Sequence, residues 1–181
     1  MFRFLLVPIL FFSPVIDVRQ NIKTVNIKLS GEDELMDDCI NSGFELRYRF
    51  EFQVCEKNHL WFDSCPRVKL ENHFLTFDNL SGTYKIVIDR FYDNHQPRTY
   101  KTDSKEDALE FMNLVNKVPL LFMADGDKEL AHSTEAYIST RVYSECYGEY
   151  NKTFARLSKI VTLGFARING FDTGWEDFPV D

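Results

Sequence analysis

An unbroken alternation of apolar and polar residues from 44 to 54 constrains the fold of this chain more than any other feature. Every second side chain is apolar, and charged or amide side chains fill the positions between them. The apolar set is Phe44, Leu46, Tyr48, Phe50, Phe52 and Val54. Successive side chains of a β-strand point to opposite faces, so this period predicts a long strand with one buried face. We expect that strand to lie within a β-sheet, because a strand alone is not stable.

Other segments have the pattern of strands that would pair with it. A second strand is predicted over 67–77 and a third over 84–92, separated by a polar turn. Sequential strands usually lie side by side, so we expect the three to form an antiparallel meander. Further strands are predicted near 24–29, at 98–102 and over 131–147, the last preceded by a hairpin turn at Asp125-Gly126-Asp127.

Two segments have helical spacing instead. Apolar residues recur every three or four positions from Ser104 to Lys117, and Pro119 is expected to stop this helix. Asp103 is predicted to cap its N-terminus, with Glu106 completing a capping box. A shorter helix is predicted from Glu32 to Ser42. The predicted fold class is α+β, mainly β: an antiparallel β-sheet or sandwich-like domain with one well-formed helix and one short helix.

Residues 1–16 have the order of an export signal. Arg3 precedes an apolar run from Phe4 to Phe12, and Ser13-Pro14 ends that run. This order predicts a signal peptide over 1–16, cleaved to leave a single β-rich domain over 17–181 outside the cytoplasm. The run is shorter than the roughly 20 residues of a membrane-spanning helix. The alternatives are an uncleaved membrane anchor over 4–16 and a buried segment of a cytoplasmic protein.

The cysteines form an even set, which an oxidising compartment can close into two disulfides. They are Cys39, Cys55, Cys65 and Cys146. Cys55 and Cys65 flank one short connection between predicted strands, so their backbones are expected to approach each other. We predict a Cys55–Cys65 disulfide, together with a Cys39–Cys146 disulfide. Free buried thiols are one alternative, and a metal site shared with nearby histidines is another, although the spacing lacks the Cys-x2-Cys of structural zinc sites.

The charge balance and the motif content exclude several classes of protein. The chain has 21 basic and 28 acidic residues and a net charge of −7, so we expect no binding to nucleic acid. It contains no nucleophile elbow, phosphate loop, dinucleotide-binding motif or zinc-protease motif. His132 and Ser133 are adjacent on a predicted strand and would point to opposite faces, so they are not expected to act as base and nucleophile. We predict no catalytic residues, no cofactor and no metal.

An aromatic pair, Trp61 and Phe62, lies in the loop between the predicted disulfide partners. Exposed, these side chains would offer a contact to another molecule; packed over the end of the sheet, they would belong to the core. The predicted function is a non-enzymatic protein that binds a protein or an envelope component through this loop or a sheet edge. The alternatives are a carrier of apolar ligands or lipids and a hydrolase built from scattered residues.

The order of these segments resembles a family of exported bacterial proteins that is catalogued as a domain of unknown function and is often encoded beside a two-component sensor kinase. The matching landmarks are the signal, the first strand, the helix before Gly43, the strand Phe44 to Phe52, Trp61, the stretch Leu75 to Tyr84, the Ala108-Leu109 helix and the closing Phe171-Asp172-Thr173-Gly174-Trp175. The resemblance implies a β-rich fold in the periplasm or cell envelope. It implies no activity and no catalytic residues.

Overall fold

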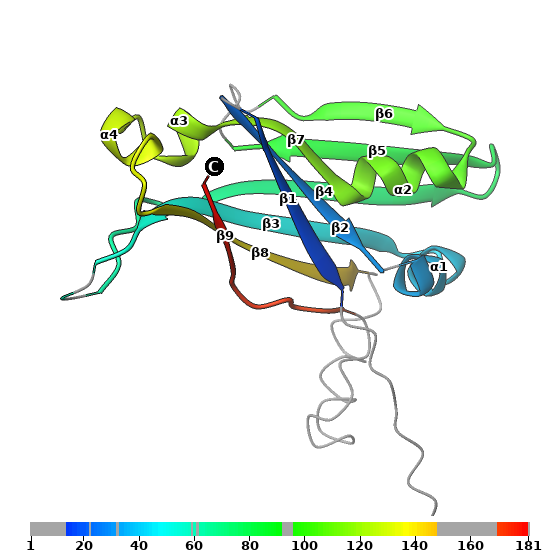
Figure 1. The fold of residues 1–181 in the computed structure, drawn as a ribbon. Helices are drawn as coiled ribbons and strands as arrows, with labels where there is room; N and C mark the ends of the chain where they lie inside the picture. Colours follow the sequence, from blue (N-terminus) through cyan, green and yellow to red (C-terminus); the bar gives the residue numbers. More distant parts are fainter. Residues whose placement is uncertain are drawn as a thin grey trace, which may run out of the picture.

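Two antiparallel β-sheets make up most of the described chain (Figure 1). The computed structural model describes residues 14–21, 23–31, 33–58, 60, 62–91, 96–147 and 170–180, with the backbone alone at 33–36. The larger sheet has the order β6 (Arg98–Thr102), β5 (Thr83–Arg90), β4 (Lys69–Asp78), β3 (Glu45–Glu56), β8 (Ala136–Tyr147) and β9 (Glu176–Pro179). The smaller sheet has the order β1 (Val15–Asn21), β2 (Thr24–Ser30) and β7 (Leu114–Pro119), and the helices are α1 (Asp33–Asn41), α2 (Lys105–Asn113), α3 (Leu120–Met123) and α4 (Lys128–Ala131). The predicted fold class, α+β and mainly β, is confirmed.

Strand β3 lies inside the larger sheet and confirms the alternation. It pairs with β4 on one side and, along its whole length, with β8 on the other. Its side chains from Leu46 to Val54 are fully buried at every second position, whereas those between them are partly exposed on the opposite face. The β3–β4–β5 meander and the strand at 98–102 also form as predicted.

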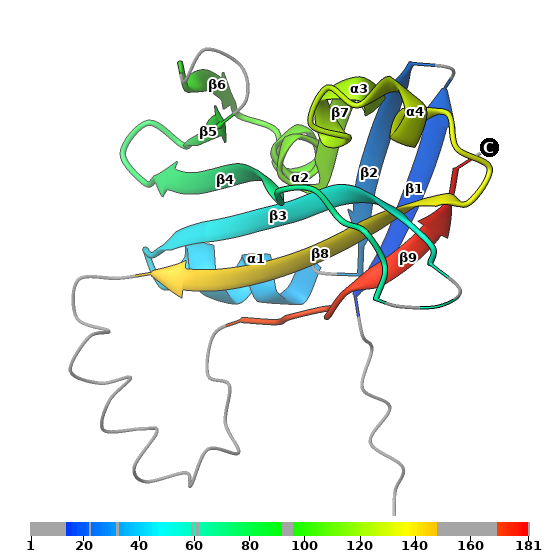
Figure 2. The ribbon, with the colours of Figure 1, turned by 90° about the vertical axis from the view of Figure 1, so that its left-hand side faces the viewer.

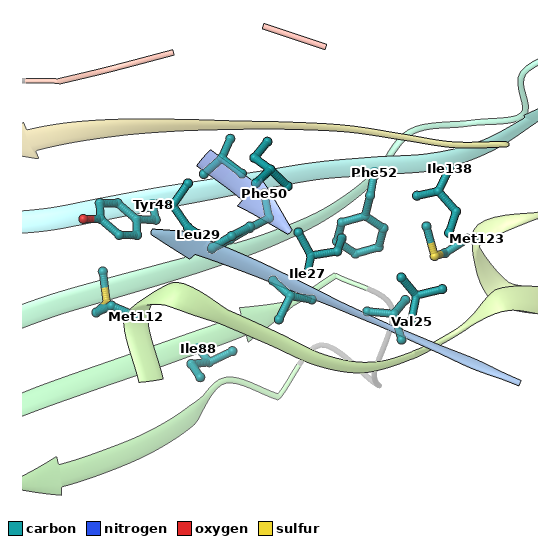
Figure 3. Close-up of a cluster of buried hydrophobic side chains, with 14 of the residues drawn as sticks. Val25, Ile27, Leu29, Tyr48, Phe50, Phe52, Ile88, Met112, Met123 and Ile138 are labelled. Atoms are coloured by element: carbon teal, nitrogen blue, oxygen red, sulfur yellow. The ribbon is translucent and has the colours of Figure 1, made fainter. Parts of the chain in front are cut away.

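The smaller sheet covers the inner face of the larger one, as Figures 1 and 2 show. Ile27 and Leu29 of β2 lie beside Phe50 of β3 in the layer between the sheets (Figure 3). Met112 from α2 and Met123 from α3 lie toward opposite ends of the same layer. The core is therefore a sandwich of two sheets that the helices complete.

The predicted helix over Ser104 to Lys117 is wrong in its last four residues. Helix α2 ends at Asn113, and the chain continues as strand β7. Val115 and Val118 pair with β2 and are fully buried there. Apolar residues three apart fit a helix. In the structure, however, these β-branched residues pair with the edge of β2 and so extend the smaller sheet. The predicted cap is also displaced by one residue, because the Ser104 hydroxyl, not Asp103, accepts the hydrogen bond from the Asp107 amide at 3.1 Å.

The N-terminal strand pattern belongs to a hairpin, β1–β2, and begins earlier than the predicted domain boundary. Ile16 pairs with Leu29 and is only 4% exposed. The boundary after residue 16 therefore falls inside β1, because the described fold begins at Val15. Residues 1–13, which hold most of the predicted signal, lie outside the described residues. No described helix has the length and apolarity needed to cross a membrane.

The predicted strand over 131–147 forms, but it starts later than predicted and a short helix precedes it. Residues 128–131 form α4, and β8 starts at Ala136 rather than near residue 131. The turn at Asp125-Gly126 joins α3 to α4 and is not a hairpin turn; Asp127 caps α4 by accepting from the Glu129 and Leu130 amides at 2.9 and 3.1 Å. An aspartate that caps a helix start is a common reason for such acids in turns.

Candidate functional site: a disulfide-closed apolar loop

Both predicted disulfides form. Cys55 and Cys65 bond with their Cα atoms 4.3 Å apart, and Cys39 bonds to Cys146 with a Cα separation of 5.7 Å. All four sulfur atoms are used in this way, so the free-thiol and metal alternatives are wrong. Disulfides persist in oxidising compartments and are rare in the cytosol, so the pair indicates an exported protein.

The Cys55–Cys65 disulfide is part of a stem that holds the connection between β3 and β4. Glu56 and Ser64 exchange two backbone hydrogen bonds, of 2.9 and 3.0 Å, directly beyond the disulfide. The Lys57 amide donates to the Glu135 carbonyl at 3.1 Å, which ties the stem to the residue before β8. We call residues 56–64 the apolar loop. Its base is fixed by covalent and hydrogen bonds.

A tyrosine of β8 supports the far side of the apolar loop. The Tyr137 hydroxyl donates to an Asp63 carboxylate oxygen at 2.6 Å, and the other oxygen accepts from the Asn58 amide at 3.1 Å. Burial of the phenol, together with the hydrogen bond and the negative charge of Asp63, raises the pKa of Tyr137 above its usual value. Both carboxylate oxygens of Asp63 therefore have a donor from within the protein.

The tip of the apolar loop carries two large apolar side chains that contact almost nothing. Leu60 is 84% exposed and Phe62 is 95% exposed. The Leu60 amide donates to the Asn58 side-chain oxygen at 3.0 Å, which places an Asx turn beneath these side chains. Phe62 does not pack over the end of the sheet, so that interpretation is wrong for this residue. Trp61, the other residue of the predicted contact, lies outside the described residues.

Charged side chains on the outer face of the larger sheet have partners within the protein. The Arg47 guanidinium lies over the Tyr147 ring, 4.1 Å from its centroid, and also pairs with Glu45. Arg141 makes a two-point ion pair with Asp172, with N–O distances of 2.9 and 2.5 Å. The charges on the outer face of the sheet are therefore largely matched within the protein.

One histidine lies beside a carboxylate, as the hydrolase alternative requires, but it lies in the core. His73 Nε2 is 2.9 Å from Glu71 Oε1, and its Nδ1 is 2.9 Å from the Met112 carbonyl oxygen. Arg90 also contacts Glu71, at 3.3 Å. The side chains of His73 and Glu71 are 0% exposed, so a substrate has no access to them in this structure. This hydrogen-bonded cluster joins β4 to α2, and Arg90 of β5 supplies the opposite charge to the buried Glu71.

The other arrangements that the alternatives would require are not assembled among the described residues. The Ser133 hydroxyl donates to Glu56 at 2.6 Å, and His132 is the residue that ends α4. The other two histidines of the chain, His59 and His95, lie outside the described residues. A hollow of about 460 Å³, lined by Pro119, Leu121, Phe122, Asp125 and Gly126, opens on the surface beside α3 and is not enclosed between the sheets. The described residues contain no group of histidine, cysteine and acidic side chains that would hold a metal ion.

The sequence identified part of this site. Phe62 and the disulfide were predicted, whereas Leu60 was not, although it lies in the same apolar run with Trp61 and Phe62. Comparison with protein-family models, with curated proteins and with solved structures finds no match to this chain. Among the described residues, the exposed tip of the apolar loop is the candidate contact site.

Proposed function

We propose that this chain is an exported, non-enzymatic binding protein of the cell envelope, and that the tip of the apolar loop is its contact site. The observation that carries the proposal is the exposure of Leu60 and Phe62 on a loop fixed at its base. Large apolar side chains cost free energy in water, roughly 1.5–3 kcal/mol for each one that is left exposed. Exposed clusters of this kind mark contact sites.

The stem of the loop supports the same function. A loop that is ordered before binding loses little conformational entropy when it binds, so its apolar side chains contribute more of their burial energy to affinity. The disulfide, the Glu56–Ser64 hydrogen bonds and the Tyr137–Asp63 hydrogen bond all restrict the loop in advance.

Retention on isolated cell envelopes tests this function. We expect purified wild-type protein to sediment with an envelope fraction and the Phe62→Ser variant to remain largely in the supernatant, because the variant lacks the more exposed tip side chain. Leu80→Ser is the matched control, since Leu80 is 100% exposed in the turn at the other end of β4. Both substitutions lie on the surface and should change the free energy of unfolding by less than about 0.5 kcal/mol. Equal retention of all three proteins would show that the tip is not the contact site.

A further inference from the structure

We infer that the tip of the apolar loop inserts its side chains into the interfacial layer of a zwitterionic lipid bilayer. This inference rests on the proposed function and names the partner of the same site. A tip of this kind has two classes of partner, an apolar pocket of another protein and a membrane surface. Three observations favour the membrane.

The first observation is the small size of the apolar surface. The described residues on either side of the tip are exposed and polar; they are Lys57, Asn58, Asp63 and Ser64. A stable protein interface buries about 800 Å² on each partner, from roughly 20–30 residues. The two described apolar side chains of the tip lie between polar residues, and the described part of the loop lacks the wide rim of such an interface. A bilayer surface needs no matching rim of polar groups, because mobile lipid headgroups can rearrange around the polar residues of the loop.

The second observation concerns the hydrogen bonds beneath the tip. In a bilayer, donors that lose water must find partners within the protein. The Leu60 and Asn58 amides already donate to side chains of the loop, at 3.0 and 3.1 Å. The Asp63 carboxylate accepts from Tyr137 and Asn58 and so keeps its hydrogen bonds when water is displaced. The side chains can therefore enter the interfacial layer without leaving these groups unsatisfied.

The third observation concerns the charges around the stem. Lys57 is exposed at the base of the tip, and its ammonium lies 5.9 Å from the centroid of the Tyr137 ring. The Tyr137 ring is buried and its hydroxyl is bound to Asp63, so it supports Lys57 from behind. The exposed ammonium of Lys57 can meet phosphate oxygens at the headgroup level when the apolar tip enters the bilayer. The whole chain carries a net charge of −7 and so gains no general attraction to anionic lipids. A zwitterionic surface is therefore the one it fits.

The chain supplies its own probe for this contact. It contains two tryptophans, Trp61 in the loop and Trp175 near β9. A Trp175→Phe background leaves Trp61 as the single tryptophan reporter. With phosphatidylcholine vesicles, we expect a blue shift of its emission and quenching by lipids brominated near the headgroup end of the acyl chains.

The comparison of variants decides the inference. In the Trp175→Phe background, Phe62→Ser should weaken vesicle binding at least about tenfold, because the tip loses its most exposed apolar side chain, whereas Leu80→Ser should leave it unchanged. Absence of a blue shift at millimolar lipid would overturn the inference, and so would equal binding by both variants. If envelopes retain the protein through Phe62 while pure lipid vesicles do not bind it, the partner is an envelope protein: the lipid inference fails and the proposed function stands.

Discussion

The Cys39–Cys146 and Cys55–Cys65 disulfides join regions of very different extent. Cys39–Cys146 spans a sequence separation of 107 residues and links α1 to β8, whereas Cys55–Cys65 spans 10 residues and closes one connection between adjacent strands. In the chain-entropy description, loops of these sizes correspond to about 4.8 and 2.7 kcal/mol of stabilisation. The first disulfide lies within the core, while the second lies at the base of the apolar loop.

The first disulfide stabilises the fold, whereas the second supports the proposed contact site. Cys39 is buried in the same core cluster as β2 and β3, so its disulfide adds a covalent bond where packing already holds the chain. The apolar loop has no such packing, because Leu60 and Phe62 are almost fully exposed. There the disulfide and a few hydrogen bonds fix the base of the loop instead of core packing.

The largest expected effect comes from removing the core disulfide. Replacing Cys39 and Cys146 together with alanine should lower the free energy of unfolding by about 4.8 kcal/mol, because the unfolded chain regains the entropy of a long loop. Urea denaturation followed by circular dichroism measures the change. If the variant still folds, its envelope retention should match that of the wild type. A loss below about 1 kcal/mol would contradict the assigned role.

Removing the loop disulfide should have a smaller effect on stability and a larger one on binding. The Cys55→Ala, Cys65→Ala variant is expected to lose about 2.7 kcal/mol, measured by the same denaturation. Its envelope retention should fall toward that of Phe62→Ser, because a mobile tip loses entropy when it binds. Unchanged retention by this variant would mean that the disulfide does not preorganise the contact site.

The smallest expected effect concerns the support of the loop by Tyr137. The Tyr137→Phe variant should lose about 1 kcal/mol through its missing hydrogen bond to Asp63. Because folding raises the pKa of Tyr137, this contribution is fully present below the usual phenol pKa near 10 and is lost as the pH rises further. The stability difference between the two proteins should therefore be constant from pH 7 to 9 and shrink above 10. A stability difference that does not change with pH would mean that the Tyr137 hydroxyl does not make this hydrogen bond to Asp63.

The sequence predicted those parts of the fold whose local pattern and tertiary environment agree. The alternation of β3 survives because its apolar face meets the smaller sheet, and the two strands that follow pair in order. The apolar spacing from Leu114 to Val118 agrees with a helix only locally. Pairing with β2 is a tertiary interaction, and no local signal records which neighbour a β-branched residue will find.

The candidate site was predictable only in outline. Cysteines that flank a short connection can be paired from their positions, and the Cys55–Cys65 disulfide follows from that geometry. The exposure of Phe62 does not follow, because an aromatic residue in a loop packs onto a sheet end as readily as it faces water. The burial of Glu71 and His73 could not be predicted either, because polar residues at alternate strand positions suggest a face exposed to solvent. Their burial depends on the contact between the two side chains and on the contact of His73 with the Met112 carbonyl, which are tertiary interactions.

The early start of β1 has a practical consequence for anyone who prepares this protein. A recombinant chain that starts at residue 17, where the sequence pattern alone would place the domain, lacks Ile16. Because Ile16 is buried and pairs with Leu29, its loss would expose one edge of the hydrophobic core. Expression vectors should therefore keep Val15 and Ile16, and purification tags should be joined upstream of them or at the C-terminus.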